Sequence, residues 1–318
     1  MILAFKHYQL IREQHRFYMN DVIKSVAITG GTHGNELTGV HLVKHWLSNP
    51  DEVKRNSFAT ELHLANPKAN QQVRRYIDQD LNRQFNIHDL QNPELQGYEQ
   101  QRAKSLAALL GPKENPRVDF VIDMHTTTAN MGMSLVFNSS DPLIVGMAFY
   151  IKQQMSDTTL FYNPHDRLED NFLTSMGRLN GLLIEVGPIA QGLLNYQIYA
   201  DTHKAVMHAL DYIEQSNTGQ MPNLPTQMEG YRFVKKIPLP QDTEGEITAM
   251  VHPNLQNKDY HAIKPGDPLF ITLAGETIVY EGEETVYGAF INEAAYYDQN
   301  IGLSFMEKIT ISPDEHQP

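Results

Sequence analysis

The sequence contains no cysteine among its 318 residues. A disulfide framework, a zinc site built from thiolates and a cysteine nucleophile are therefore excluded. A chain without disulfides fits the reducing interior of a cell, so we expect a cytoplasmic protein.

Positive charge is also scarce, since 25 Lys and Arg face 38 Asp and Glu, for a net charge of −13. A nucleic-acid partner would require a basic face, which this balance argues against. No apolar run reaches the length that spans a membrane. Residues 1–20 lack the continuous apolar core of a signal peptide. We therefore expect a soluble protein that binds neither nucleic acid nor membranes.

What the chain does contain is typical of a globular α/β protein, with 41% hydrophobic and 20% charged residues. Apolar runs that predict strands alternate with segments of helical periodicity over the first two thirds. The predicted strands are 26–29, 62–65, 120–123, 134–137 and 182–184, and the predicted helices are 37–47, 94–110, 142–154 and 195–215. This alternation predicts a mostly parallel sheet covered by helices on both faces.

The composition and the predicted secondary structure of the chain change near residue 216. Residues 217–225 are rich in turn formers and predict a linker after a first domain, 1–216. Short β-branched segments separated by Pro, Gly and Asp follow, which predict a smaller β-rich domain over 226–318. Its predicted strands are 231–234, 269–273, 285–287 and 289–291.

Three side chains that can bind a metal follow two of the predicted strands. His33 and Glu36 lie in the segment G-G-T-H-G-N-E-L, and His125 lies in V-I-D-M-H-T. Two histidines and one glutamate would leave a fourth position of a zinc ion open for water, as catalytic zinc requires and structural zinc does not. We therefore predict one catalytic Zn²⁺ per chain at these three residues.

Chance is the alternative explanation, because a chain with 14 histidines contains an H-x-x-E segment easily. The context favours the zinc site. His33 lies in a glycine-rich turn between a strand and a helix, at the carboxyl edge where open α/β sheets place their sites.

Glu185 ends the predicted strand 182–184, in the segment I-E-V-G-P. Zinc polarises a carbonyl and lowers the pKa of its bound water to roughly 7, but amide hydrolysis also needs a group that moves a proton to the leaving amine. Glu185 is a candidate for that group. A surface glutamate at a strand end remains the alternative, because the residues alone do not separate the two.

A basic segment from Arg74 to Arg83, R-R-Y-I-D-Q-D-L-N-R, stands out in this acidic chain. Arginine binds carboxylates through two parallel hydrogen bonds, and asparagine can add another. Asn82 and Arg83 are candidates for binding an acidic substrate. A solvated loop is the alternative, and it fits Arg74 better than Asn82 or Arg83.

Six ordered motifs resemble those of the aspartoacylase and succinylglutamate desuccinylase family of zinc-carboxypeptidase-like hydrolases, over residues 24–297. They are G-G-T-H-G-N-E-L-T-G-V, R-Y-I-D-Q-D-L-N-R, D-M-H-T-T-T-A-N-M-G, I-E-V-G-P-I-A-Q-G, H-P-N-L-Q and I-N-E-A-A-Y-Y, where Ile291 replaces the family's valine. The resemblance implies the zinc-carboxypeptidase-like fold, hydrolysis of N-acetyl-L-aspartate to acetate and L-aspartate by a zinc-activated water, and a homodimer.

The resemblance also implies a role for each matching residue. His33, Glu36 and His125 are the expected zinc ligands, and Glu185 is the expected general base and acid. Arg75 is expected to polarise the scissile carbonyl. Asn82 and Arg83 are expected to hold the α-carboxylate of the substrate. Tyr296 is expected to contact the substrate from the β-rich domain, which caps the active site. Glu293 is expected to hold this domain in place.

One family residue has no counterpart in this chain. The resemblance to the aspartoacylases of this family implies an arginine for the substrate's side-chain carboxylate about ten residues before the catalytic glutamate, where this chain has Ser175. Arg178 is our predicted replacement, and a solvated arginine on a mobile loop is the alternative interpretation of that residue. Arg167 is the next candidate.

Other interpretations remain open. The same motifs fit a deacylase of N-acyl aromatic amino acids, and a non-catalytic zinc-binding protein is an alternative of another class. The chain begins about a dozen residues earlier than the family leads us to expect, so residues 1–18 are either an N-terminal extension or precede a start at Met19.

Overall fold

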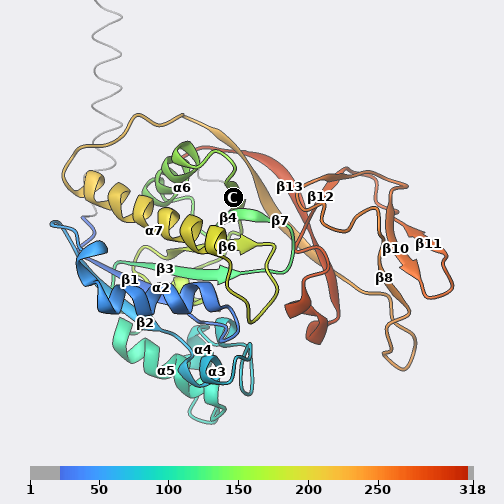
Figure 1. Ribbon diagram of the computed structural model, residues 1–318, viewed down its shortest axis with the longest axis horizontal. Coiled ribbons are helices and arrows are strands. Elements are labelled where there is room, and N and C mark those ends of the chain that lie inside the picture. The colour runs from blue at the N-terminus through green and yellow to red at the C-terminus, as the bar shows by residue number, and fades with distance from the viewer. Residues whose placement is uncertain (1–21, 314–318) are drawn as a thin grey trace, which may run out of the picture.

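The computed structural model describes residues 22–313 (Figure 1). The N-terminal extension and the alternative start at Met19 lie outside the described residues. Among residues 22–313, no helix combines the length and the apolar character needed to cross a membrane.

A mixed ten-stranded sheet forms the centre of the fold. In spatial order its strands are β2 (Ala59–Leu64), β1 (Ser25–Gly30), β3 (Phe120–Thr126), β6 (Gly181–Gly187), β4 (Gly132–Phe137), β5 (Thr159–Tyr162), β7 (Met228–Pro238), β13 (Ile301–Ile311), β12 (Val286–Ala289) and β9 (Ala262–Ile263). The neighbouring strands β2, β1, β3 and β6 are parallel to one another. The next strand, β4, runs antiparallel to β6, and β5 pairs parallel to β4 and to β7.

Helices cover both faces of the parallel part of this sheet (Figure 1). One face carries α2 (Leu37–Ser48), α6 (Pro142–Gln154) and α7 (Tyr196–Asn217), and the other carries α5 (Tyr98–Leu110) with the short α3 (Pro67–Gln71) and α4 (Ile87–Gln91). Successive side chains of β1 point to opposite faces of the sheet. Val26 and Ile28 pack in the core under α2, whereas Ala27 packs in the core under α5. The predicted α/β fold is therefore confirmed.

The 3-10 helices are η1 (Pro50–Glu52), η2 (Leu81–Arg83), η3 (Leu173–Met176) and η4 (Ala294–Gln299). Two of these, η2 and η4, carry residues of the site described below.

The C-terminal third is β-rich, as predicted, and includes a second sheet of β8 (Ala249–Val251), β10 (Pro268–Thr272) and β11 (Thr277–Val279). The parallel pairing of β7 with β5 carries the main sheet across the predicted boundary at residue 216. The predicted strands 285–287 and 289–291 are one strand, β12. It ends because Phe290, with φ 52°, turns the backbone into the left-handed region.

The strand register brings the carboxyl ends of β1, β3 and β6 to one edge of the sheet. Gly30 at the end of β1 pairs with Met124, and His125 on β3 pairs with Glu185 on β6. Side chains that follow or end these strands therefore meet at a common place.

Candidate active site

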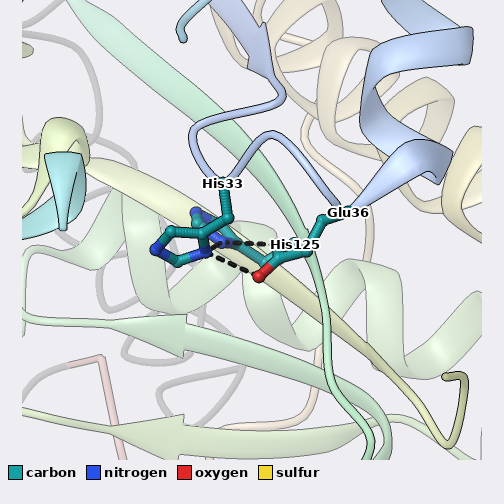
Figure 2. Close-up of side chains that lie close together, drawn as sticks. All are labelled: His33, Glu36 and His125. Atoms are coloured by element: carbon teal, nitrogen blue, oxygen red, sulfur yellow. Dashed lines mark hydrogen bonds and ion pairs between the residues drawn. The ribbon is translucent and has the colours of Figure 1, made fainter. Parts of the chain in front are cut away.

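The three predicted metal ligands lie together at this edge, from two elements (Figure 2). His33 lies in the turn after β1, Glu36 is the residue before α2, and His125 is on β3. Gly31 makes the turn with φ 69°. A Cβ on Gly34 would lie 2.2 Å from the Ala69 carbonyl carbon, so glycine alone lets this turn pack against the backbone of α3.

The donor atoms of the three side chains face one another. His33 Nδ1 lies 2.6 Å from Glu36 Oε1, His125 Nδ1 lies 3.0 Å from Glu36 Oε2, and the two Nδ1 atoms are 3.1 Å apart. All three residues are at most 4% exposed. Zinc bonds of about 2.0–2.2 Å place the ligands of a tetrahedral site roughly 3.3 Å apart, which is close to these separations.

Each imidazole is oriented by a carboxylate that contacts its Nε2 atom, on the side of the ring away from the cluster. His33 Nε2 lies 3.0 Å from Asp80 Oδ1, and His125 Nε2 lies 2.7 Å from Asp123 Oδ2. Asp123 in turn accepts hydrogen bonds from Thr29 and Thr32. These carboxylates favour a hydrogen on each Nε2, which leaves both Nδ1 lone pairs aimed at the cluster, as in carboxylate–histidine–zinc arrangements.

The charges of the cluster fit a cation. Burial opposes ionisation of Glu36, but His33 and His125 outweigh it and hold the pKa of this carboxyl well below its usual range. Burial also opposes a charged His125, but Asp123 and Glu36 hold the pKa of that imidazole well above its usual value. The pocket thus favours positive charge between the Nδ1 atoms, where a bound cation would replace the proton. The residues present fit a metal ion.

Glu185 faces the same cavity and is 8% exposed. Among residues 22–313 its carboxylate has no hydrogen-bond or ion-pair partner. Burial and the nearby Glu36 raise the pKa of Glu185 well above its usual value. An unpaired buried carboxyl with a raised pKa can exchange a proton with a reactant, which a surface glutamate would not be placed to do.

Arg75 connects the metal cluster to Asp80. Its Nη1 donates to Glu36 Oε1 at 3.3 Å and its Nη2 donates to Asp80 Oδ2 at 2.9 Å. Its buried Nε has no hydrogen-bond partner within the described part of the chain. The two Nη atoms carry four N–H groups, of which the bonds to Glu36 and Asp80 use two, so the guanidinium lines the cavity with further donors.

The buried carboxylate of Glu99 holds the loop that carries Arg75 and Asp80. Glu99, on α5, accepts from the backbone N–H groups of Ile77, Asp78 and Gln79 at 2.7–3.2 Å. Sequence reasoning missed Glu99, because nothing local distinguishes it from other glutamates on a helix.

Asn82 and Arg83, at the end of this loop in η2, also line the cavity. The Asn82 side-chain oxygen accepts from Leu173 N at 2.8 Å. Arg83 donates to the Asn82 carbonyl at 2.7 Å, and its guanidinium lies 4.8 Å from the Phe172 ring centroid. No carboxylate within residues 22–313 forms an ion pair with Arg83.

The C-terminal region closes the cavity through η4. Tyr296 is 9% exposed and lines the cavity, and burial raises the pKa of its hydroxyl to about 12. Glu293, which caps η4, accepts hydrogen bonds from the backbone N–H groups of Thr128 and Ala129 at 2.7 and 3.1 Å. This buried carboxylate therefore ties the capping segment to the loop that follows His125.

The cavity has a volume of about 290 Å³. Apolar side chains form much of its wall: Val136, Phe161, Phe172, Leu183, Phe233 and Phe290. Its cationic lining consists of Arg75, Arg83 and Lys236. Lys236 was not predicted from the sequence.

The structure does not bring Arg178 to this cavity, which corrects the prediction that it receives a substrate carboxylate. Its Nε donates to Asp119 Oδ1 at 2.7 Å, just before β3 begins. That edge of the sheet is opposite the one that holds His125. Arg167 is no substitute, because its guanidinium donates to the carbonyls of Ser175 and Lys113 and does not line the cavity.

Two family models match the chain. The succinylglutamate desuccinylase/aspartoacylase catalytic domain matches residues 22–213, and the AstE/AspA barrel-sandwich hybrid domain matches residues 226–308.

Individual proteins match over most of their length. A probable aspartoacylase from Nostoc sp. is 44% identical over 92% of this chain and 98% of its own. A human N-acyl-aromatic-L-amino acid amidohydrolase (carboxylate-forming) is 40% identical over 91% and 92%. The crystal structure of murine aminoacylase 3 superposes with a TM-score of 0.86 at 36% identity, covering 92% of this chain and 98% of the other. The chain therefore belongs to the succinylglutamate desuccinylase/aspartoacylase family of hydrolases.

Proposed function

We propose that the protein is a zinc-dependent amidohydrolase that cleaves N-acetyl-L-aspartate to acetate and L-aspartate. The observation that carries this proposal is the cluster of His33, Glu36 and His125 beside the unpaired carboxylate of Glu185. A purely structural metal site has no use for such a carboxylate, which argues against a non-catalytic zinc-binding protein.

In this proposal His33, Glu36 and His125 hold one zinc ion. When bound, zinc supplies a Lewis acid that polarises the amide carbonyl and promotes ionisation of water. The protein's part is to keep the ligands buried and to fix their orientation through Asp80 and Asp123.

Glu185 moves the proton. Its carboxylate takes a proton from the attacking water as the new C–O bond forms, and then gives it to the amide nitrogen as the C–N bond breaks. Its raised pKa supports the second half of this task, since a carboxyl with a pKa nearer neutrality holds the proton until the amine leaves. Arg75 stabilises negative charge that develops on the carbonyl oxygen, through the donor capacity left in its guanidinium.

Asn82 and Arg83 bind the α-carboxylate of the substrate in this proposal. The support is that Arg83 has no carboxylate partner within residues 22–313, although the chain as a whole is strongly acidic. Tyr296, on η4, contacts the substrate from the C-terminal region, and Glu293 holds η4 in place.

A deacylase of N-acyl aromatic amino acids is the second candidate. Four phenylalanines in the cavity wall would accept an aromatic side chain, and relatives of that activity share 40% identity with this chain. We favour aspartate because three cations line the same cavity. The homodimer and the cytoplasmic location remain predictions from the sequence.

Turnover of N-acetyl-aspartate beside N-acetyl-tyrosine, with and without a chelator, tests the proposed function. We expect hydrolysis of N-acetyl-aspartate with the higher kcat/KM, lost on chelation and restored by zinc. A higher kcat/KM for N-acetyl-tyrosine would establish the aromatic alternative. No hydrolysis of either substrate by the zinc-loaded protein would contradict both.

Substitutions in the basic loop separate binding from chemistry. Arg83→Ala should chiefly raise KM, because a carboxylate is bound in the ground state and the transition state alike. Arg75→Ala should chiefly lower kcat, by roughly 10²–10³, because the charge it meets develops during the reaction. Steady-state kinetics on N-acetyl-aspartate measure both. The same kinetic pattern in the two variants would contradict this division of roles.

A further inference from the structure

N-acetyl-aspartate has a second carboxylate, for which the roles above provide no receptor. Arg178 and Arg167 are occupied elsewhere, and Ser175, where the resemblance led us to expect an arginine, is buried and donates to the Phe172 carbonyl. A receptor must therefore come from another part of the fold.

The three cations that line the cavity differ in how far they are already paired. Arg75 forms ion pairs with Glu36 and Asp80. Lys236 donates only to a neutral amide oxygen, Gln299 Oε1, at 3.3 Å. Within residues 22–313, no carboxylate oxygen lies within ion-pair distance of the Lys236 ammonium group.

Lys236 reaches the cavity because of an irregularity in β7. Lys236 pairs with Ser304 and Lys235 pairs with Phe305, but Met306 pairs with Phe233, so one extra residue is inserted in β7. A bulge of this kind changes the face on which the following side chains lie. Phe233 and Lys236 consequently share the cavity side, although they are three residues apart. Lys235 lies opposite Phe305, which belongs to the core of the C-terminal region.

The position of Lys236 suits a ligand that already contacts Arg83. Its ammonium lies 5.5 Å from the ring centroid of Tyr296. Partial burial and repulsion by the Arg83 guanidinium lower the pKa of Lys236, against the opposing effect of Asp80. An anion with two carboxylates would relieve this repulsion.

We propose that Lys236 binds the side-chain carboxylate of a dicarboxylic N-acyl amino acid, while Asn82 and Arg83 hold its α-carboxylate. This inference rests on the proposed function and deepens it, because it names the residue that selects an acidic side chain. The selecting cation thus comes from β7 of the C-terminal region, rather than from the segment before Glu185 where the resemblance led us to expect it.

The test compares N-acetyl-aspartate with N-acetyl-asparagine, which has the same shape and lacks the second charge. Lys236→Met should lower kcat/KM for N-acetyl-aspartate about tenfold, because it removes the cation that pairs with the second carboxylate. We expect no larger loss, because Lys236 lines the cavity but is exposed, and solvent weakens an exposed ion pair. Its kcat/KM for N-acetyl-asparagine should stay within about twofold of wild type. Lys236→Arg should retain most of the preference for aspartate, because it keeps the charge.

Lys235→Met is the matched control, because it removes a lysine from the adjacent position on the opposite face of β7. We expect both substrates to behave as with the wild-type enzyme. Equal losses on both substrates in Lys236→Met, or no loss on either, would overturn the inference.

A binding measurement separates this inference from the proposed function. In the Glu185→Gln background, calorimetry should show tighter binding of N-acetyl-aspartate than of N-acetyl-asparagine, and Lys236→Met should abolish the difference. If that holds while the wild-type enzyme hydrolyses neither compound, the proposed function fails and the role of Lys236 stands. If Glu185→Gln binds both compounds equally or neither of them, the role of Lys236 is wrong.

Discussion

Glu185→Gln should lower kcat for N-acetyl-aspartate by roughly 10²–10⁴ while the protein keeps its zinc. Glutamine preserves the shape of the side chain and removes the group that accepts and returns the proton. The metal should stay, because the side chains of the three candidate ligands contact one another and, within residues 22–313, none of them forms a hydrogen bond or an ion pair with the Glu185 carboxylate. Steady-state kinetics and metal analysis of the dialysed variant measure the two effects.

Glu169→Gln is the control for this experiment. Glu169 also lines the cavity, but its side chain is 62% exposed and lies near Asn86 and His88 rather than near the metal cluster. It should retain a kcat close to that of the wild-type enzyme. Loss of zinc in Glu185→Gln would make Glu185 a ligand, and a wild-type kcat would assign the proton transfer to another group.

The sequence predicted the centre of this site because its parts follow local patterns. His33, Glu36, His125 and Glu185 each follow or end a short apolar run, and parallel strands bring their carboxyl ends together. No knowledge of distant contacts was needed beyond the α/β alternation itself. For the same reason the helices with clear periodicity, such as α2 and α6, begin and end close to the predicted residues.

Arg178 was mispredicted because distance along the chain was taken for distance in space. It precedes β6, whereas Glu185 lies toward the other end of that strand. A strand advances about 3.3 Å per residue, so seven residues of extended chain separate the two positions by roughly 20 Å. Arg178 therefore belongs to the amino edge of the sheet, where Asp119 pairs with it.

Lys236 could not have been predicted, because the bulge in β7 that directs it depends on pairing with β13, about 70 residues later in the chain. The strand β13 itself was missed although it spans Ile301–Ile311. Its pairing with β7 is entirely non-local. Glu99 is similar, because its function as an acceptor for three backbone N–H groups appears only when α5 packs beside the loop that holds Arg75.

His125→Ala should reduce bound zinc from about one ion per chain to less than a tenth of that, and activity with it. The substitution removes one of three protein ligands, whereas loss of a residue that merely orients a ligand typically costs 10–100-fold in metal affinity. The protein should still fold. Glu36 keeps hydrogen bonds from Arg75 and from the Thr126 N–H, and the cores on both faces of the sheet do not include His125.

Metal analysis after dialysis, together with urea unfolding, measures this result. His41→Ala is the matched control, because His41 is an exposed histidine on α2, only five residues beyond Glu36, and is not part of the cluster. It should keep its zinc and its activity. If His125→Ala retained a full equivalent of zinc, the metal would be bound elsewhere. If instead the wild-type protein stayed fully active after its zinc had been stripped, the reaction would not depend on the metal, and the catalytic role of the cluster would be wrong.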